Sequence, residues 1–194
     1  MKKDILIALN VSFITLLLTA GLYPLLVTGF SSLFFPHQVS GSLIKDKNGK
    51  VIGSELLSQK FSTPAYFFPR PAAKNKGYNG VSSGGSNLGP TSLALIQEIQ
   101  ERISHISKVN SAPIPLDLVT ASASGFDPHI SLEAALWQAP QVALQRNVSL
   151  ERIVSLIESM KEPRYFYILG EPRVNVLMLN LTLDHYFGPP GRQP

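Results

Sequence analysis

The most distinctive pattern in the chain is a long apolar segment close to the N-terminus. After Asp4, no Asp, Glu, Lys or Arg occurs until Lys45, and residues 5–35 are overwhelmingly hydrophobic. About 20 apolar residues in a helix are enough to cross the hydrocarbon core of a bilayer, where a single span satisfies its backbone hydrogen bonds only as a helix. The pattern therefore predicts a short N-terminal segment at 1–6 and one transmembrane helix at 7–34.

A cleaved signal peptide is the alternative interpretation of this segment. Signal peptides have an apolar region of about 7–15 residues that ends at a cleavage site of small residues. The run here is longer, and its small residues at 19–21 lie in its middle, so we favour an uncleaved anchor. Lys2 and Lys3 precede the span and no basic residue follows before Lys45, which predicts a cytoplasmic N-terminus and an exterior domain. Pro24 should kink the helix.

Beyond the anchor, the pattern predicts one mixed α+β domain at 35–187 and a disordered tail at 188–194, which is rich in Gly and Pro. Residues 42–53 form two short runs around an Asn-Gly pair, a pair that is typical of β-hairpin turns. Residues 62–92 carry many prolines and glycines, but also aromatic residues that need burial or a partner. We therefore expect an ordered loop there rather than a flexible linker.

Helical signals are the clearest in the domain. Isoleucines spaced by three and four residues give one apolar face to a helix that we expect to begin at Pro90: Ile96, Ile99, Ile103 and Ile106. Ser131 and Ser149 are the expected N-caps of two further helices. Pro140 should either divide the first of these into two short helices or kink it.

Strand signals are weaker. Short apolar runs predict brief strands at 116–120 and 164–168. Two interpretations stay open for Val174–Leu183. Near-alternation of polar and apolar residues favours a strand, whereas Asn175 as an N-cap favours a helix.

Composition narrows the range of functions. The net charge is +4, but the basic residues are scattered singly or in pairs, so nucleic-acid binding is not indicated. A mildly basic soluble surface is the favoured interpretation. The chain has no cysteine, which excludes disulfides, a thiol nucleophile and thiolate metal sites.

A glycine-rich segment precedes the helix predicted at Pro90. Backbone amides at a helix N-terminus can bind phosphate, so the segment supplies weak candidates for a nucleotide contact: Ser83, Gly84, Gly85, Ser86, Asn87 and Gly89. The Walker spacing is absent, and no buried strand precedes the glycines as a dinucleotide fingerprint requires. Roles in turns and in helix capping are therefore the favoured explanation.

Four residues within eight positions offer the groups of a serine hydrolase: Ser122, Ser124, Asp127 and His129. Their context does not match the Gly-x-Ser-x-Gly nucleophile elbow, and members of a triad seldom lie so close in sequence. A turn in which these side chains bond to local backbone explains the same residues. An independent membrane-anchored serine hydrolase of the cell envelope stays the alternative function, and no catalytic residue is predicted. Two ligands are too few for a zinc site, so no metal site is predicted either.

A set of short segments, in one order along almost the whole chain, carries a more specific signal than any single motif. Besides the N-terminal anchor, the segments are Gly53–Leu56, Tyr66–Phe67, Arg70–Pro71, Tyr78–Asn79, Ser83–Thr91, Asp117–Gly125, Asp127–Ser131, Gly170–Leu177 and Leu179–Leu181. Together they resemble the C-subunit family of the Kdp potassium-transporting P-type ATPase.

The resemblance implies an accessory membrane subunit of a high-affinity, ATP-driven potassium uptake complex in the bacterial inner membrane, with a periplasmic domain. The implied partners are the ATP-hydrolysing P-type subunit, a channel-like potassium-binding subunit and a small accessory subunit, so the complex handles ATP and potassium and this chain needs no cofactor of its own. The resemblance also implies a role in assembly and a role as a catalytic chaperone that raises the ATP affinity of the hydrolysing subunit. Because the predicted topology places the glycine-rich segment outside, away from cytoplasmic ATP, we favour assembly over direct nucleotide contact.

Candidate contacts with partner subunits come from two parts of the chain. Polar side chains within a transmembrane helix can hydrogen-bond to a neighbouring helix, which applies to Asn10 and Thr15. The loop at 62–92 supplies the other candidates: Tyr66, Phe67, Arg70, Tyr78 and Asn79.

Overall fold

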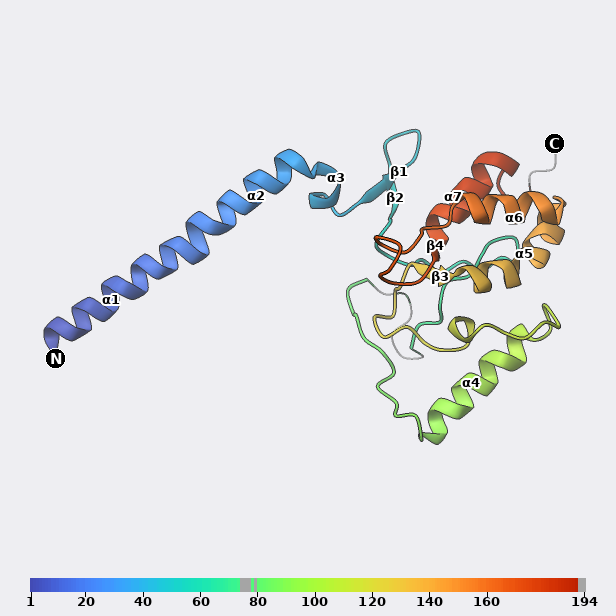
Figure 1. Ribbon diagram of the computed structural model, residues 1–194, viewed down its shortest axis with the longest axis horizontal. Helices are drawn as coiled ribbons and strands as arrows, with labels where there is room; N and C mark the ends of the chain where they lie inside the picture. The colour runs from blue at the N-terminus through green and yellow to red at the C-terminus, as the bar shows by residue number, and fades with distance from the viewer. Residues whose placement is uncertain (74–77, 79, 192–194) are drawn as a thin grey trace. The chain divides into compact units, whose positions relative to one another are not determined.

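The computed structural model of the protein describes residues 1–73, 78 and 80–191 (Figure 1). The chain forms two compact units, Met1–Ile44 and Lys45–Pro194. The first is mostly helical, and the second contains helices and short strands. The α+β class predicted from the sequence is therefore confirmed, with an apolar helix ahead of a mixed domain.

The first unit contains one continuous helix, Lys2–Phe34, of 33 residues with a mean hydropathy of 2.3. It has three consecutive parts: α1 (Lys2–Leu16), a π-helical turn (Leu17–Leu22) and α2 (Tyr23–Phe34). The π-helical turn ends just before Pro24, whose ring lacks an amide proton and crowds the carbonyl one turn earlier, and such a wider turn accommodates the break. The first six residues belong to this helix from Lys2 onward, and a four-residue helix, α3 (Pro36–Val39), follows it.

The hairpin predicted at 42–53 is confirmed. β1 (Leu43–Lys45) and β2 (Val51–Ser54) form a two-stranded sheet. In the turn between them, the carboxylate of Asp46 accepts a hydrogen bond from the amide of Asn48 at 2.8 Å. Gly49 adopts a φ of 79°, which is why a glycine is needed at this position.

The core of the second unit lies where three helices meet a small sheet (Figure 1). Its elements are β3 (His129–Ser131), α5 (Leu132–Arg146), α6 (Leu150–Ser159), β4 (Arg173–Asn175) and α7 (Val176–Phe187). β3 and β4 pair in antiparallel register, with Ile130 opposite Val174. Side chains with almost no exposed surface come from each of these elements and from the loop before α4: Phe67, Ile130, Val142, Ile153, Ile157, Val174, Leu179 and Leu183.

Side-chain caps fix where two of the core helices begin. The hydroxyl of Ser131 accepts a hydrogen bond from the amide of Ala134 at 3.0 Å, which confirms Ser131 as the N-cap of α5. The side chain of Asn175 accepts one from the amide of Met178 at 3.2 Å. The two interpretations of 174–183 are thereby resolved, because a short strand ends at Asn175 and a helix begins directly after it.

Pro140 does not divide its helix into two short helices, so this alternative of the prediction was wrong. α5 runs as one helix from Leu132 to Arg146 with Pro140 inside it. Proline removes one hydrogen bond of the helix, but seven residues of α5 are buried in the core, and this packing outweighs the local loss. α6 begins after Ser149 as predicted, although the Ser149 hydroxyl makes no cap bond.

The helix expected to begin at Pro90 begins three residues later. α4 spans Leu93–Ile106, with Ser92 at the N-cap position. No residue of α4 is buried, and Ile96 and Ile103 keep 44% and 39% of their surface exposed. The isoleucine spacing therefore identified the helix correctly, but its apolar face is only partly covered.

Two predicted strands were wrong. At 116–120 the chain instead forms a 3-10 helix, Leu116–Leu118, and the carboxylate of Asp117 within it accepts a hydrogen bond from the amide of Ser131 at 2.7 Å. At 164–168 the chain forms a tight turn closed by a bridge between Tyr165 and Leu169. Both runs have the composition of strands, but in the described structure neither continues alongside a partner strand.

Candidate functional site

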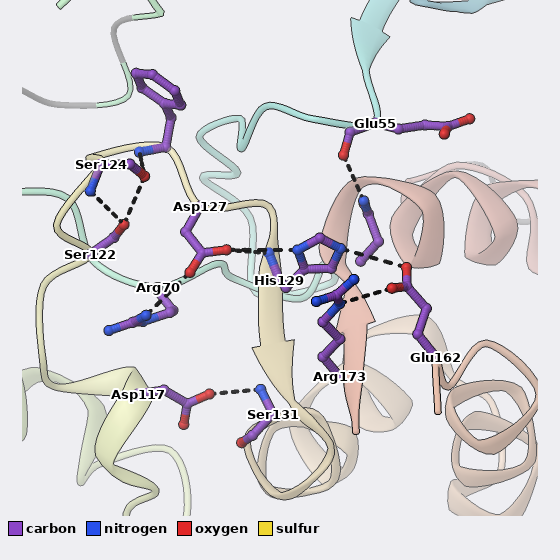
Figure 2. Close-up of polar contacts among 12 residues, drawn as sticks. Glu55, Arg70, Asp117, Ser122, Ser124, Asp127, His129, Ser131, Glu162 and Arg173 are labelled. Carbon is purple, nitrogen blue, oxygen red and sulfur yellow. Dashed lines mark hydrogen bonds and ion pairs between the residues drawn. The ribbon is translucent and has the colours of Figure 1, made fainter. Parts of the chain in front are cut away.

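The groups of the hydrolase alternative lie near the start of β3, but they do not form a triad (Figure 2). The hydroxyl of buried Ser122 lies 3.0 Å from that of Ser124 and accepts a hydrogen bond from the Ser124 amide. The ring of His129 faces carboxylates, with Nδ1 3.8 Å from Asp127 and Nε2 3.5 Å from Glu162. A general base must reach its nucleophile, yet among the described residues neither serine hydroxyl bonds to His129. The serines serve the local turn, and the hydrolase alternative is not favoured.

A row of charged and polar side chains crosses the edge of the β3–β4 sheet (Figure 2). Arg70 forms an ion pair with Asp127 at 3.1 Å, His129 lies between Asp127 and Glu162, and Glu162 pairs with Nε of Arg173 at 2.9 Å. The hydrogen bond that the Arg173 guanidinium donates to the carboxylate of Glu162 raises the pKa of Arg173. Arg70, Asp127, His129 and Arg173 line a shallow groove of about 240 Å³. These pairs join the loop before α4, β3 and the segment before β4, which is a structural role.

No metal-binding arrangement is formed in the part of the chain that the structure describes. Across residues 1–73, 78 and 80–191, no three His, Asp or Glu side chains gather in a way that could hold an ion.

The glycine-rich segment packs against the serine turn. The amide of Gly84 and the hydroxyl of Ser83 both donate to the carbonyl of Ser124, at 3.0 and 3.2 Å. Gly85 lies so close to the facing chain that a Cβ there would be 3.1 Å from the Cα of Ala123. The segment therefore uses its small residues for close backbone contact with 122–124.

The second half of this segment does not lead directly into a helix. Asn87 adopts a left-handed φ of 55°, and the carbonyl of Gly89 accepts a hydrogen bond from the amide of Ser92. α4 begins only after Ser92, so its N-terminal amides lie beyond the glycines. The turn explanation is therefore favoured for Ser86 and its neighbours, and a nucleotide contact stays a prediction.

Two of the expected partner contacts are used within the domain itself. Phe67 has no exposed surface, so its side chain offers nothing to a partner. The hydroxyl of Tyr66 donates to Asp184 at 2.7 Å, and the guanidinium of Arg146 lies 4.7 Å from the centre of the Tyr66 ring. Burial, followed by the hydrogen bond to Asp184, raises the pKa of Tyr66. These contacts fasten the ordered loop to α5 and α7.

The remaining interface candidates keep accessible surface or fall outside the description. Arg70 keeps 29% of its side chain exposed, and its carbonyl accepts a hydrogen bond from the hydroxyl of Tyr78 at 3.0 Å. Burial raises the pKa of Tyr78. Asn10 and Thr15 lie on α1, none of whose residues is buried. Asn79 lies outside the described residues, and the proposed roles of all five residues at an interface stay predictions.

An apolar cavity of about 400 Å³ lies beneath α4. It is lined by residues of the proline-rich loop, α4, α5 and the segment that follows α4, among them Phe68, Arg102, Ile106, Leu118 and Trp137. Of the isoleucines of α4, Ile106 lines this cavity, at the C-terminal end of the helix.

Sequence reasoning missed one surface feature. Residues 165–168, predicted as part of a strand at 164–168, instead belong with Leu169 to the exposed tip of the segment between α6 and β4. Its aromatic composition, bounded by Pro163 and Gly170, is the signal that could have marked it as a turn.

Together, the helix and the domain define a membrane-anchored α+β protein whose polar clusters hold its own segments together. The chain belongs to the KdpC family, described as the c chain of the K+-transporting ATPase, whose model matches residues 5–185. It is similar to the potassium-transporting ATPase KdpC subunit of Myxococcus xanthus, with 49% identity over 97% of this chain and 91% of that protein. The corresponding proteins of Rhodospirillum rubrum and Methylococcus capsulatus are each 50% identical, over 88% and 91% of this chain and 90% and 95% of their own lengths.

Proposed function

We propose that this chain is an accessory membrane subunit of an ATP-driven potassium uptake complex, and that it is needed for the assembly of that complex. The observation that carries the proposal is the family match, because it extends over both the membrane-length helix and the domain. The similar proteins are named as subunits of a potassium-transporting ATPase. The serine and histidine groups of this chain are engaged in a turn and in charge pairs, which supports a non-hydrolytic role.

The proposed partners are the ATP-hydrolysing P-type subunit, the channel-like potassium-binding subunit and a small accessory subunit. The chain is anchored among them by its N-terminal helix in the bacterial inner membrane. Lys2 and Lys3 precede the apolar run and Lys45 is the first basic residue after it, which supports a cytoplasmic N-terminus and a periplasmic domain.

Any effect on the ATP affinity of the hydrolysing subunit is proposed to be indirect. Ser83 and Gly84 are the nearest to a phosphate-binding pattern, yet their polar groups already bond to the carbonyl of Ser124. In the proposed orientation the same residues face the periplasm, where cytoplasmic ATP is absent. These observations support an effect that passes through the assembled complex rather than through nucleotide contact.

The proposal is tested by deleting the chain and restoring it in cells that depend on the complex. We expect loss of potassium-stimulated ATPase activity and of co-purification of the other subunits, and recovery of both with the restored chain. A Ser122→Ala or His129→Ala variant that folds should restore them as well, because neither residue is proposed to catalyse a reaction. Normal assembly and activity without the chain would contradict the proposal.

Orientation has its own test. A periplasm-dependent reporter enzyme fused after Pro194 should be active, and the same fusion with a cytoplasm-dependent reporter should not. The opposite result would reverse the proposed topology and reopen direct contact with ATP.

A further inference from the structure

Five consecutive side chains form an exposed apolar tip between α6 and β4. Their exposed fractions are 62% for Tyr165, 84% for Phe166, 89% for Tyr167, 76% for Ile168 and 62% for Leu169. Single exposed apolar residues are common on proteins, but a contiguous group of large ones marks an interaction surface. We call residues 165–169 the aromatic tip.

The backbone holds the aromatic tip in a defined shape. Tyr165 and Leu169 exchange two backbone hydrogen bonds of 2.9 Å each. Between them, Phe166 and Tyr167 adopt φ values of 52° and 62°, a left-handed conformation that bulky residues rarely adopt. Because the turn is this tight, the two rings project away from the domain instead of folding back on it.

The charges next to the aromatic tip are neutralised in pairs. Glu162 and Arg173 exchange backbone hydrogen bonds of 2.9 and 3.2 Å and also form an ion pair. Arg164 pairs with Glu171 at 2.5 Å, and residues 165–170 carry no charge. The surface offered at the tip is therefore apolar, with tyrosine hydroxyls as its only side-chain polar groups.

The base of the tip lies at the edge of the domain where the chain enters it. Asn175, two residues after Arg173, donates a hydrogen bond from its side chain to the carbonyl of Glu55 at 2.8 Å (Figure 2). Glu55 directly follows β2, the first strand wholly within the domain.

Ten residues, 35–44, separate the end of α2 from the domain, and a chain of this length extends over at most about 35 Å. The domain therefore stays close to the bilayer that its helix crosses, and the effective concentration of lipid at the tip is high.

We propose that the aromatic tip inserts into the headgroup region of the bilayer that the chain's own helix crosses. Tyrosine is favoured at membrane interfaces, and phenylalanine and leucine side chains there are buried at the boundary between the headgroups and the acyl chains. All five side chains of the turn are exposed. Fluid lipid can surround such a turn on every side, whereas a preformed protein groove would cover only part of it. This inference rests on the membrane anchoring in the proposed function, but not on potassium transport.

Site-specific labelling tests the proposal, because the chain has no native cysteine. The full-length variants Tyr167→Cys, Leu33→Cys and Leu144→Cys each receive one environment-sensitive fluorophore and are reconstituted in phosphatidylcholine bilayers. Leu144 is 78% exposed near the end of α5, roughly 20 Å by helical rise from Ser131, which pairs with Arg173. Lipids with a spin label high on the acyl chain should remove most of the emission at position 167 and at position 33, and little at position 144.

The outcomes separate this inference from the proposed function. Quenching at 33 but not at 167 would overturn tip insertion, whereas quenching at neither position would overturn membrane anchoring itself. If the partner subunits are added and the label at 167 becomes shielded from both lipid and aqueous quenchers, the tip binds a protein and the proposal fails. A Phe166→Asp change in the Tyr167→Cys chain, with an unchanged unfolding transition, should abolish lipid quenching at 167, and retained quenching would contradict insertion by the tip.

Discussion

Asn180 and Phe67 exchange two hydrogen bonds inside the core of the domain. The side-chain oxygen of Asn180 accepts from the amide of Phe67 at 2.9 Å, and its side-chain nitrogen donates to the carbonyl of Phe67 at 2.9 Å. Both residues are essentially inaccessible to solvent. One side chain on α7 thus satisfies both backbone groups of a loop residue that has no strand partner.

Replacing Asn180 with leucine should therefore destabilise the domain. The change leaves a buried amide and a buried carbonyl without partners, which costs about 2–4 kcal/mol of unfolding free energy. Denaturant unfolding of the full chain in detergent, followed through the fluorescence of the single Trp137, measures it. Gln97→Ala, on the exposed face of α4, is the matched loss of an amide and should change stability by less than about 0.5 kcal/mol. Equal effects would contradict the role assigned to Asn180.

Arg146 should be sensitive even to a change that keeps its charge. Its side chain is 2% exposed and donates to the carbonyls of Ala65 and Gly188 and to Asp184, at 2.7, 2.8 and 2.8 Å. Lysine cannot reproduce this planar arrangement, so Arg146→Lys should lower the unfolding free energy by about 2–3 kcal/mol. Arg152→Lys is the control.

Arg152 is exposed on α6, and its guanidinium lies over the ring of Phe187. Because this contact is near solvent, the lysine variant should lose less than about 1 kcal/mol. A loss as large as that of Arg146→Lys would show that the hydrogen bonds of Arg146 are not the cause.

Two glycines of the same segment should respond differently to alanine. At Gly85 the added Cβ would lie 3.1 Å from the Cα and 3.3 Å from the carbonyl oxygen of Ala123, whereas at Gly89 nothing lies within 4 Å. Overpacking should make Gly85→Ala destabilising by about 1–2 kcal/mol, while Gly89→Ala should change stability by less than about 0.5 kcal/mol. Thermal unfolding of both variants measures the difference, and equal midpoints would contradict the close contact with Ala123.

The stability of the domain should fall in alkaline solution through Tyr66. Burial and the hydrogen bond to Asp184 raise the pKa of Tyr66 above its ordinary value of 10, so in the folded state the phenol stays protonated where the unfolded chain ionises. Above pH 10 the unfolded state then binds fewer protons than the folded state, and the unfolding free energy decreases as pH rises. Well below pH 10 the phenol is protonated in both states, and the stabilisation that Tyr66 contributes to the folded state is fully present.

Tyr66→Phe should accordingly show a shallower loss of stability above pH 10, measured by urea unfolding at a series of pH values. Burial also raises the pKa of Tyr78, so Tyr78→Phe should change the slope in the same direction. Wild-type slopes in both variants would contradict the assignment.

The features that the sequence predicted correctly depend on local chemistry. Asn48-Gly49 sets a turn through a positive φ, and Ser131 caps α5 with its own hydroxyl, so neighbouring residues carry the information. The division at Pro140 failed because burial of α5 outweighs one missing helical hydrogen bond. The strand at 164–168 failed because strand propensity does not reveal whether a partner strand exists.

The candidate site was less predictable, since its contacts join distant segments. The polar residues near position 127 were recognised as a turn, but their pairing with Arg70 and the pairing of His129 with Glu162 required the fold. Phe67 was expected at a partner surface because aromatic residues in a loop need cover. The cover comes from the core instead, and no local pattern distinguishes these two outcomes.

The hollow beneath α4 gives this helix a distinct dynamic character. α4 has no buried residue; Ile106 packs against the core at its C-terminal end, and Arg102 donates to the carbonyl of Val119 at 2.9 Å. Segments with few buried contacts open at a small fraction of the free energy of global unfolding. The backbone amides of α4 should consequently exchange with deuterium well before those of α5, so that the domain opens by releasing one helix while its core stays closed.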